Sequence, residues 1–178
     1  MTVAMKRIAF VIVTIVLTAL CAHAQAPAQQ EGVPEGPGLE FVCELRVNCE
    51  GTYTVGQTSH GNRVVIPIVG GTFEGPRMKG TILSGGADYQ LVDQEHGRTE
   101  VEAIYSIKTD DDVYIHIRNC GIIHTGNGPD GKPEFYFRTT PKFEAPQDSA
   151  YDWLNNAVFV CMPGFATDCI CLRIWKVL

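Results

Sequence analysis

Hydrophobic and polar residues alternate through much of the chain after residue 38, with the period of two that is typical of β-strands. In the segment 98–108, one face is apolar and the other is largely polar or charged. The apolar face consists of Val101, Ala103, Tyr105 and Ile107. The segment 113–118 alternates in the same way. Because neighbouring side chains of a strand point to opposite faces, the pattern predicts an antiparallel sheet with one face in water.

Short strand-like runs, separated by turn residues, continue to the C-terminus. They cover the ranges 39–47, 62–69, 88–94, 98–108, 113–120, 134–140, 157–162 and 168–178. Many short strands with turns every ~8–12 residues are typical of a sandwich or a closed barrel. We favour an all-β fold with a single antiparallel β-barrel, because no residues plainly protect two long sheet edges. One short helical turn is expected at 150–155, capped by Asp148 or Ser149, with Trp153 and Leu154 closing one end of the barrel.

The densest glycine pattern lies in Gly70–Gln90, where glycine occupies positions 70, 71, 75, 80, 85 and 86. Glycine permits positive φ and close approach of the backbone, so this spacing indicates turns and bulges between short strands. Two polar residues, Asp88 and Gln90, follow the pair of glycines at 85 and 86. We therefore expect a tight meander that places polar side chains at one defined position.

The first 24 residues are typical of a secretory signal peptide. Lys6 and Arg7 precede the apolar run Ile8–Leu20, and the segment Ala22–Ala24 fits a cleavage site. The run is shorter than the about 20 residues that span a membrane, and retention as an anchor is the alternative to cleavage. Residues 25–38, rich in Pro, Gly, Gln and Glu, are expected to be a flexible leader to a domain at 39–178. The sequence therefore predicts a secreted or periplasmic protein without a membrane partner after cleavage.

Cleavage would also change the charge of the chain. Losing two basic residues leaves 12 Lys and Arg against 20 Asp and Glu, so the net charge falls from −6 to −8. Because nucleic acids and anionic membranes attract basic surfaces, this excess of acid argues against both as partners. The sequence does not specify an oligomeric state.

Six of the seven cysteines lie in the mature chain, and an even number in an exported protein predicts disulfides. The six are Cys43, Cys49, Cys120, Cys161, Cys169 and Cys171. Their pairing is left open, although Cys169 and Cys171 would share one face of a strand and are expected to have separate partners. A metal site is the weaker interpretation, because there is no Cys-x-x-Cys pair and no spaced pair of histidines.

The glycine-rich stretch also carries a family resemblance. The runs Gly70–Pro76 and Gly85–Gln90 resemble the family called domain of unknown function 3237, also known as uncharacterised protein family 0311. Later runs agree with it, namely Ala103–Tyr105, Lys108–Asp111, Tyr136–Thr139 and Tyr151–Asn155. The resemblance covers about residues 39–178 and implies a calycin-like β-barrel, without an assigned activity. The export signal and the six cysteines depart from the commoner pattern of that family.

The sequence contains no Gly-x-Ser-x-Gly elbow, P-loop, dinucleotide fingerprint or His-Glu-x-x-His motif, and no cofactor is predicted. Asp88 is the best candidate for a catalytic base, because desolvation in a barrel would raise its pKa. The alternative is that its carboxylate accepts backbone N–H bonds and fastens its own turn. Tyr105 is the second catalytic candidate, since its hydroxyl is expected to point inward, although an ordinary core tyrosine is the alternative. Glu74 is a candidate second carboxylate, with a solvated surface glutamate as the alternative.

Our leading hypothesis is an exported barrel that binds a small organic molecule. Polar contacts would come from Asp88, Gln90, Tyr105 and Arg138, and apolar walls from Phe137, Phe143 and Trp153. Arg138 could hold a ligand carboxylate or phenolate, or form a structural ion pair instead. The alternatives are a cofactor-independent isomerase, cyclase or lyase with Asp88 as base, and a filled barrel that acts through its surface.

Overall fold

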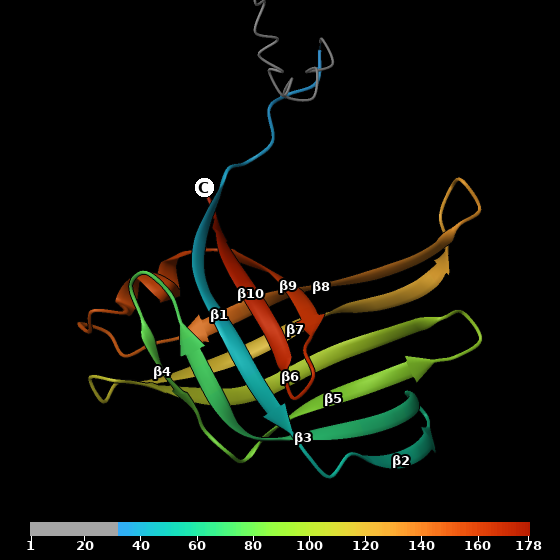
Figure 1. Ribbon diagram of the computed structural model, residues 1–178, viewed down its shortest axis with the longest axis horizontal. Helices are drawn as coiled ribbons and strands as arrows, with labels where there is room; N and C mark the ends of the chain where they lie inside the picture. The colour runs from blue at the N-terminus through green and yellow to red at the C-terminus, as the bar shows by residue number, and fades with distance from the viewer. Residues whose placement is uncertain (1–31) are drawn as a thin grey trace, which may run out of the picture. The chain divides into compact units, whose positions relative to one another are not determined.

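A computed structural model describes residues 32–178, and the predicted signal peptide lies outside the described residues. The described part contains ten β-strands and one short 3₁₀ helix, coloured along the chain in Figure 1. They are β1 (Leu39–Cys49), β2 (Tyr53–Thr58), β3 (Gly61–Glu74), β4 (Lys79–Ile82), β5 (Gly86–Asp93), β6 (Arg98–Thr109), β7 (Tyr114–Asn127), β8 (Pro133–Glu144), η1 (Asp152–Asn156), β9 (Phe159–Phe165) and β10 (Ile170–Val177). In this part of the chain, no helix is long and apolar enough to cross a membrane.

The strands form one antiparallel sheet that closes on itself (Figure 1). The hydrogen-bonded order runs β1-β10-β9-β8-β7-β6-β4-β3, and pairing of β1 with β3 closes the ring. β4 and β5 share one place in the wall, because β3 pairs with β5 along 62–68 and with β4 along 71–74. With β2 attached outside the ring, eight strand positions remain, and the predicted single antiparallel β-barrel is confirmed.

The inward face of the sheet carries the predicted apolar residues. Val101, Tyr105 and Ile107 of β6 are buried, and Ala103 between them is half-buried. The most deeply buried large side chains come mainly from β1, β6, β7, β9 and β10, and include Leu45, Ile115, Ile117, Phe159 and Ile174. The alternation read from the sequence therefore sets the inside and the outside of the barrel.

The predicted helical turn exists, but its cap differs from the expectation. The helix η1 begins after Tyr151, and no side chain caps it. Ser149 Oγ instead accepts a hydrogen bond from the Tyr151 backbone N–H at 3.2 Å, and Asp148 adopts a positive φ of 63° in the preceding turn. Leu154 is buried in the core cluster, as expected of a residue that closes one end of the barrel.

Glycine allows strands to cross closely where β3 meets β1. A Cβ atom on Gly71, which has a φ of +139°, would lie 2.0 Å from the carbonyl oxygen of Arg46. A Cβ atom on Gly75 would lie 2.0 Å from the carbonyl oxygen of Val42. The glycine pattern therefore serves close contacts that help to close the barrel, in addition to turns.

Candidate functional site

A cavity of about 150 Å³ lies inside the barrel and is lined by residues from β1, β3, β5, β6, β7, β8, β9 and β10. Its wall is mostly apolar, with Val47, Ile68, Val101, Phe137 and Leu172 among its members. A few polar side chains face the same space. An apolar cavity with a small number of polar groups is the usual form of a small-molecule site.

Three of these polar groups have no hydrogen bond of good geometry within the described residues, although the thiol of Cys161, a weak partner, interacts with two of them, Asn119 and Thr139. They are the Tyr105 hydroxyl, the Asn119 Oδ1 atom and the Thr139 hydroxyl. Their residues are only 2%, 3% and 4% exposed, so bulk water does not solvate them. They come from the adjacent strands β6, β7 and β8. Because buried polar groups are nearly always paired, this cluster is the strongest chemical feature of the cavity.

Asp88 on β5 lines the same cavity. Its Oδ2 atom accepts a hydrogen bond from Gln90 Nε2 at 2.7 Å, and its Oδ1 atom accepts one from the Glu102 backbone N–H at 3.0 Å. Burial raises the pKa of the Asp88 carboxyl, and these two hydrogen bonds offset part of that rise. The carboxylate fastens β5 to β6, which differs from the expected role within its own turn.

Four of the predicted site residues line the cavity, namely Asp88, Gln90, Tyr105 and Phe137. Two more lie in the apolar core away from it. The Phe143 ring packs edge-on against Phe159 at a centroid distance of 4.9 Å. Trp153 in η1 packs against the same Phe159 ring. The Arg77 guanidinium lies 4.1 Å from the centroid of the Trp153 ring. Phe143 and Trp153, which were expected to form walls of the site, therefore do not line this cavity.

Two charged candidates face away from the cavity. Arg138 is exposed, donates a hydrogen bond to the Phe137 carbonyl at 2.6 Å, and lies over the Tyr136 ring. Because Phe137 points inward, its neighbour on the strand has to point outward. Glu74 is exposed at the end of β3 and does not line the cavity. Arg138 and Glu74, which were expected to contact a ligand, therefore do not line this cavity.

Sequence reasoning missed Asn119 and Thr139. Both positions follow the inward alternation of their strands, since Ile115 and Ile117 precede Asn119, and Phe137 precedes Thr139. A polar residue in an inward register was therefore the available signal.

All six described cysteines are free thiols in this structure, and the predicted disulfides stay a prediction. The sulfur atoms of the free thiols Cys169 and Cys171 lie 3.8 Å apart, and the expectation that the two have separate disulfide partners stays a prediction. Cys169 directly precedes β10, so the two cysteines do not lie together on one strand as expected. Among residues 32–178, no three His, Cys, Asp or Glu side chains converge as metal ligands would.

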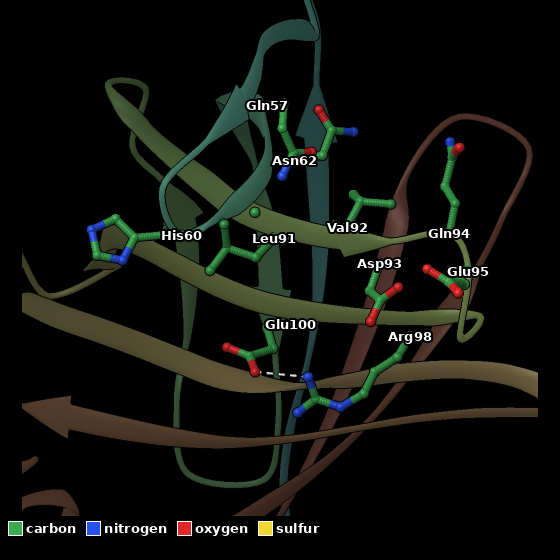
Figure 2. A pocket seen from close by; sticks show the side chains of 11 residues that line it. Gln57, His60, Asn62, Leu91, Val92, Asp93, Gln94, Glu95, Arg98 and Glu100 are labelled. Atoms are coloured by element: carbon green, nitrogen blue, oxygen red, sulfur yellow. Dashed lines mark hydrogen bonds and ion pairs between the residues drawn. The ribbon is translucent and has the colours of Figure 1, made fainter.

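A larger hollow of about 630 Å³ lies on the outside, beside β2, β3, β5 and β6 (Figure 2). Its charged groups are exposed and several are paired. Arg98 Nη1 lies 2.7 Å from Glu100 Oε1, as the dashed line in Figure 2 shows. Asp93 Oδ2 lies 2.8 Å from Nδ1 of the neighbouring His96. Exposed pairs of this kind contribute little energy and define no ligand chemistry. The internal cavity is therefore the better candidate, although it is smaller.

Comparison with known proteins agrees with the barrel and leaves its chemistry open. A family model described as a protein of unknown function, DUF3237, matches residues 37–177. A UPF0311 protein of Clostridium acetobutylicum is 32% identical over 149 residues, covering 78% of this chain and 92% of the relative. A crystal structure described as a β-barrel-like protein from Acinetobacter baumannii is 30% identical with a TM-score of 0.71, covering 83% of this chain and all of that one. A structure described as an enzyme from Penicillium herquei has a TM-score of 0.65 over 84% of this chain and all of that one; at 21% identity this likeness concerns the fold alone.

Proposed function

Since the chain belongs to the DUF3237 family, whose description assigns no function, we propose from its own geometry that it binds a small organic molecule inside the barrel. The observation that carries this proposal is the convergence of Tyr105, Asn119 and Thr139 on one apolar cavity without partners. Leaving one buried polar group unpaired costs about 1–3 kcal/mol. A ligand that pairs with these groups would offset that cost.

The size of the cavity limits the ligand. A cavity of about 150 Å³ is comparable to an engineered protein cavity that holds benzene. One aromatic or aliphatic ring with short substituents therefore fits without a change in the wall. A larger ligand would have to enlarge the cavity.

The location of the protein outside the cytoplasm is also a proposal. With the signal peptide predicted at residues 1–24, we place the mature protein in the periplasm or outside the cell. Its ligand would then be a molecule met outside the cytoplasm.

Filling the cavity tests this function. Ala103 lines the cavity and its neighbour Ile104 lies on the opposite face of β6, so Ala103→Leu and Ile104→Leu form a matched pair. A library of single-ring compounds is screened against the mature protein by ligand-detected NMR. We expect compounds that bind wild type to lose at least about tenfold in affinity to Ala103→Leu and to keep their affinity for Ile104→Leu. Equal binding to both variants, or no binding to wild type, would contradict the proposal.

One observation favours catalysis as a second candidate. Of the carboxylates in residues 32–178, only Asp88 lines the cavity, and burial raises its pKa toward the range useful for proton transfer. Asp88 would act as a base without a cofactor, and the Tyr105 hydroxyl would hold the oxygen that gains charge. If the bound compound is turned over, Asp88→Asn should slow turnover by about 10²–10⁴-fold with binding retained. Unchanged turnover in this variant would exclude that role.

A further inference from the structure

The charges around the cavity are unbalanced. Among the residues that line it, Asp88 is the only acidic one, and there is no Lys, Arg or His. Arg138, which lies between the cavity-lining Phe137 and Thr139, is exposed and donates a hydrogen bond to the Phe137 carbonyl. An anionic ligand would therefore meet a carboxylate and no cation. Burying an unpaired charge is so costly that such a ligand would be rejected.

A cationic ligand would also find few favourable contacts in the cavity. Both oxygens of Asp88 already accept hydrogen bonds, from Gln90 Nε2 and from the Glu102 backbone N–H. The desolvation cost of a buried ion pair is often as large as the attraction that it gains. The three groups without partners are all uncharged, so a ligand can satisfy them with hydrogen bonds and needs no charge to do so.

The groups without partners indicate which polar groups the ligand should carry. The Tyr105 and Thr139 hydroxyls can each donate and accept, and Asn119 Oδ1 accepts. A ligand hydroxyl or N–H group can donate to Asn119, while a hydroxyl or carbonyl oxygen can accept from either side-chain hydroxyl. The apolar remainder of the wall suits a ring.

We propose that the cavity selects an uncharged single-ring molecule that carries at least one hydroxyl or N–H group, and that it rejects carboxylate analogues of the same size. This inference rests on the proposed function, because it names the ligand class of the same cavity. It differs from the expectation of a carboxylate or phenolate ligand, since that expectation depended on Arg138 facing inward.

Four probes with the same seven-carbon skeleton separate charge from hydrogen bonding. They are benzyl alcohol, benzoate, benzylammonium and toluene, titrated against the mature protein at neutral pH by ligand-detected NMR. We expect benzyl alcohol to bind at least about tenfold more tightly than each of the other three, because one good hydrogen bond or one buried charge changes affinity by about that factor or more. Removing the charge of Asp88 with Asp88→Asn should narrow the gap between benzyl alcohol and benzoate.

Hydroxyl deletions locate the polar contact. Thr139→Val and Tyr105→Phe keep the side-chain shape, so they should reduce the preference for benzyl alcohol over toluene. Thr140→Val is the matched control, because Thr140 lies on the outer face of β8 and donates its hydroxyl to the Cys120 carbonyl. This control should keep the preference, and circular dichroism confirms that each variant folds.

The outcomes of these titrations test the proposed ligand class separately from the proposed binding function. Benzoate or benzylammonium binding as tightly as benzyl alcohol would overturn the ligand class and leave a binding cavity in place. Toluene binding as tightly as benzyl alcohol would overturn the hydrogen-bonding requirement. A preference for benzyl alcohol over benzoate that stays unchanged in Asp88→Asn would overturn the assignment of the rejection to Asp88. No binding of any probe to wild type would contradict the proposed function itself.

Discussion

At the scale of single residues, the barrel keeps polar side chains at inward positions where apolar ones would pack. Thr139 and Asn119 occupy such positions without a protein partner, and Asp88 occupies one with two partners. Thr139 and Asn119 depart from the apolar pattern of their strands, whereas Asp88 lies beside the polar Gln90 and joins β5 to β6. Residues that break a local rule without an evident structural gain are expected at functional sites.

Thr139→Val should stabilise the protein. The substitution replaces an unpaired buried hydroxyl with a methyl group of similar shape, so the unfolding free energy should rise by about 1 kcal/mol. Urea unfolding of both proteins without ligand measures the difference. Thr140→Val, on the outer face, should change stability by less than about 0.5 kcal/mol. A loss of stability in Thr139→Val would mean that the hydroxyl has a structural partner.

The pKa of Asp88 predicts a pH dependence with a definite sign. Its pKa in the folded protein is raised above the ordinary value of 3.8, so the folded state holds this proton more tightly than the unfolded state. The stability that the protonated carboxyl contributes is therefore present below about pH 4 and is lost as the pH rises through the folded value. Relative to wild type, Asp88→Asn should gain stability between pH 3 and pH 7 in urea unfolding.

Asp93 is the control for that experiment, because its shift has the opposite direction. Hydrogen bonds from His96 lower the pKa of the Asp93 carboxyl on the protein surface. Its contribution is present above the ordinary value and is lost as the pH falls through the lowered one. Asp93→Asn should therefore lose stability, relative to wild type, over the same rise in pH. The same direction of change in both variants would show that the effect is not specific to Asp88.

At the scale of elements, the glycine-rich segment forms β4, the second half of β3 and the start of β5. The sequence predicted a meander that delivers polar groups, and Asp88 and Gln90 do reach the cavity from β5. The same glycines also allow β3 to approach β1 and so close the ring. Pairing partners so far apart in sequence could not be read from local pattern.

Gly75→Ala tests that close approach. Its Cβ atom would lie 2.0 Å from the Val42 carbonyl oxygen, so the backbone must shift and stability should fall by about 1–3 kcal/mol. Gly164→Ala is the matched control, because a Cβ atom there meets nothing within 4 Å and neither glycine has a positive φ. Thermal unfolding compares the two. Equal effects would mean that the contact between these strands is not tight.

At the scale of the whole molecule, the closed ring separates an inside from an outside along every strand. The wall is least continuous between β8 and β9, where Thr139 and Cys161 form the one residue pair among the described residues. By contrast, β8 pairs with β7 along its whole length. Phe137 and Phe165 lie on these two strands and both line the cavity, with ring centroids 6.2 Å apart. Phe165 is largely exposed, so this side of the wall joins the cavity to the surface.

The closed barrel also predicts that the thiols of the reduced protein react at different rates with an alkylating reagent. Burial raises the pKa of Cys43 to about 12 and that of Cys161 to about 11, and both side chains are inaccessible. Burial and the neighbouring Cys171 also raise the pKa of the Cys169 thiol, but its side chain is half-buried and not inaccessible. Because a thiol has to be both ionised and accessible to react, iodoacetamide at pH 8 should modify Cys169 well before either of them. Peptide mass spectrometry follows each site, and unfolding in urea should make all three react. Equal rates in the folded protein would contradict a closed barrel.

The sequence by itself determined the fold class, the inward faces of the long strands and the position of Asp88 on a strand after paired glycines. These follow from local rules, because strand alternation and glycine conformation act between neighbours in the chain. Only the tertiary structure decided which side chains share the cavity. Asn119 and Thr139 join Asp88 there, and Arg138 is excluded, because ring closure and register between distant strands set those distances. A shift of one residue in register would exchange the inner and outer faces, and no local pattern fixes that choice across the whole ring.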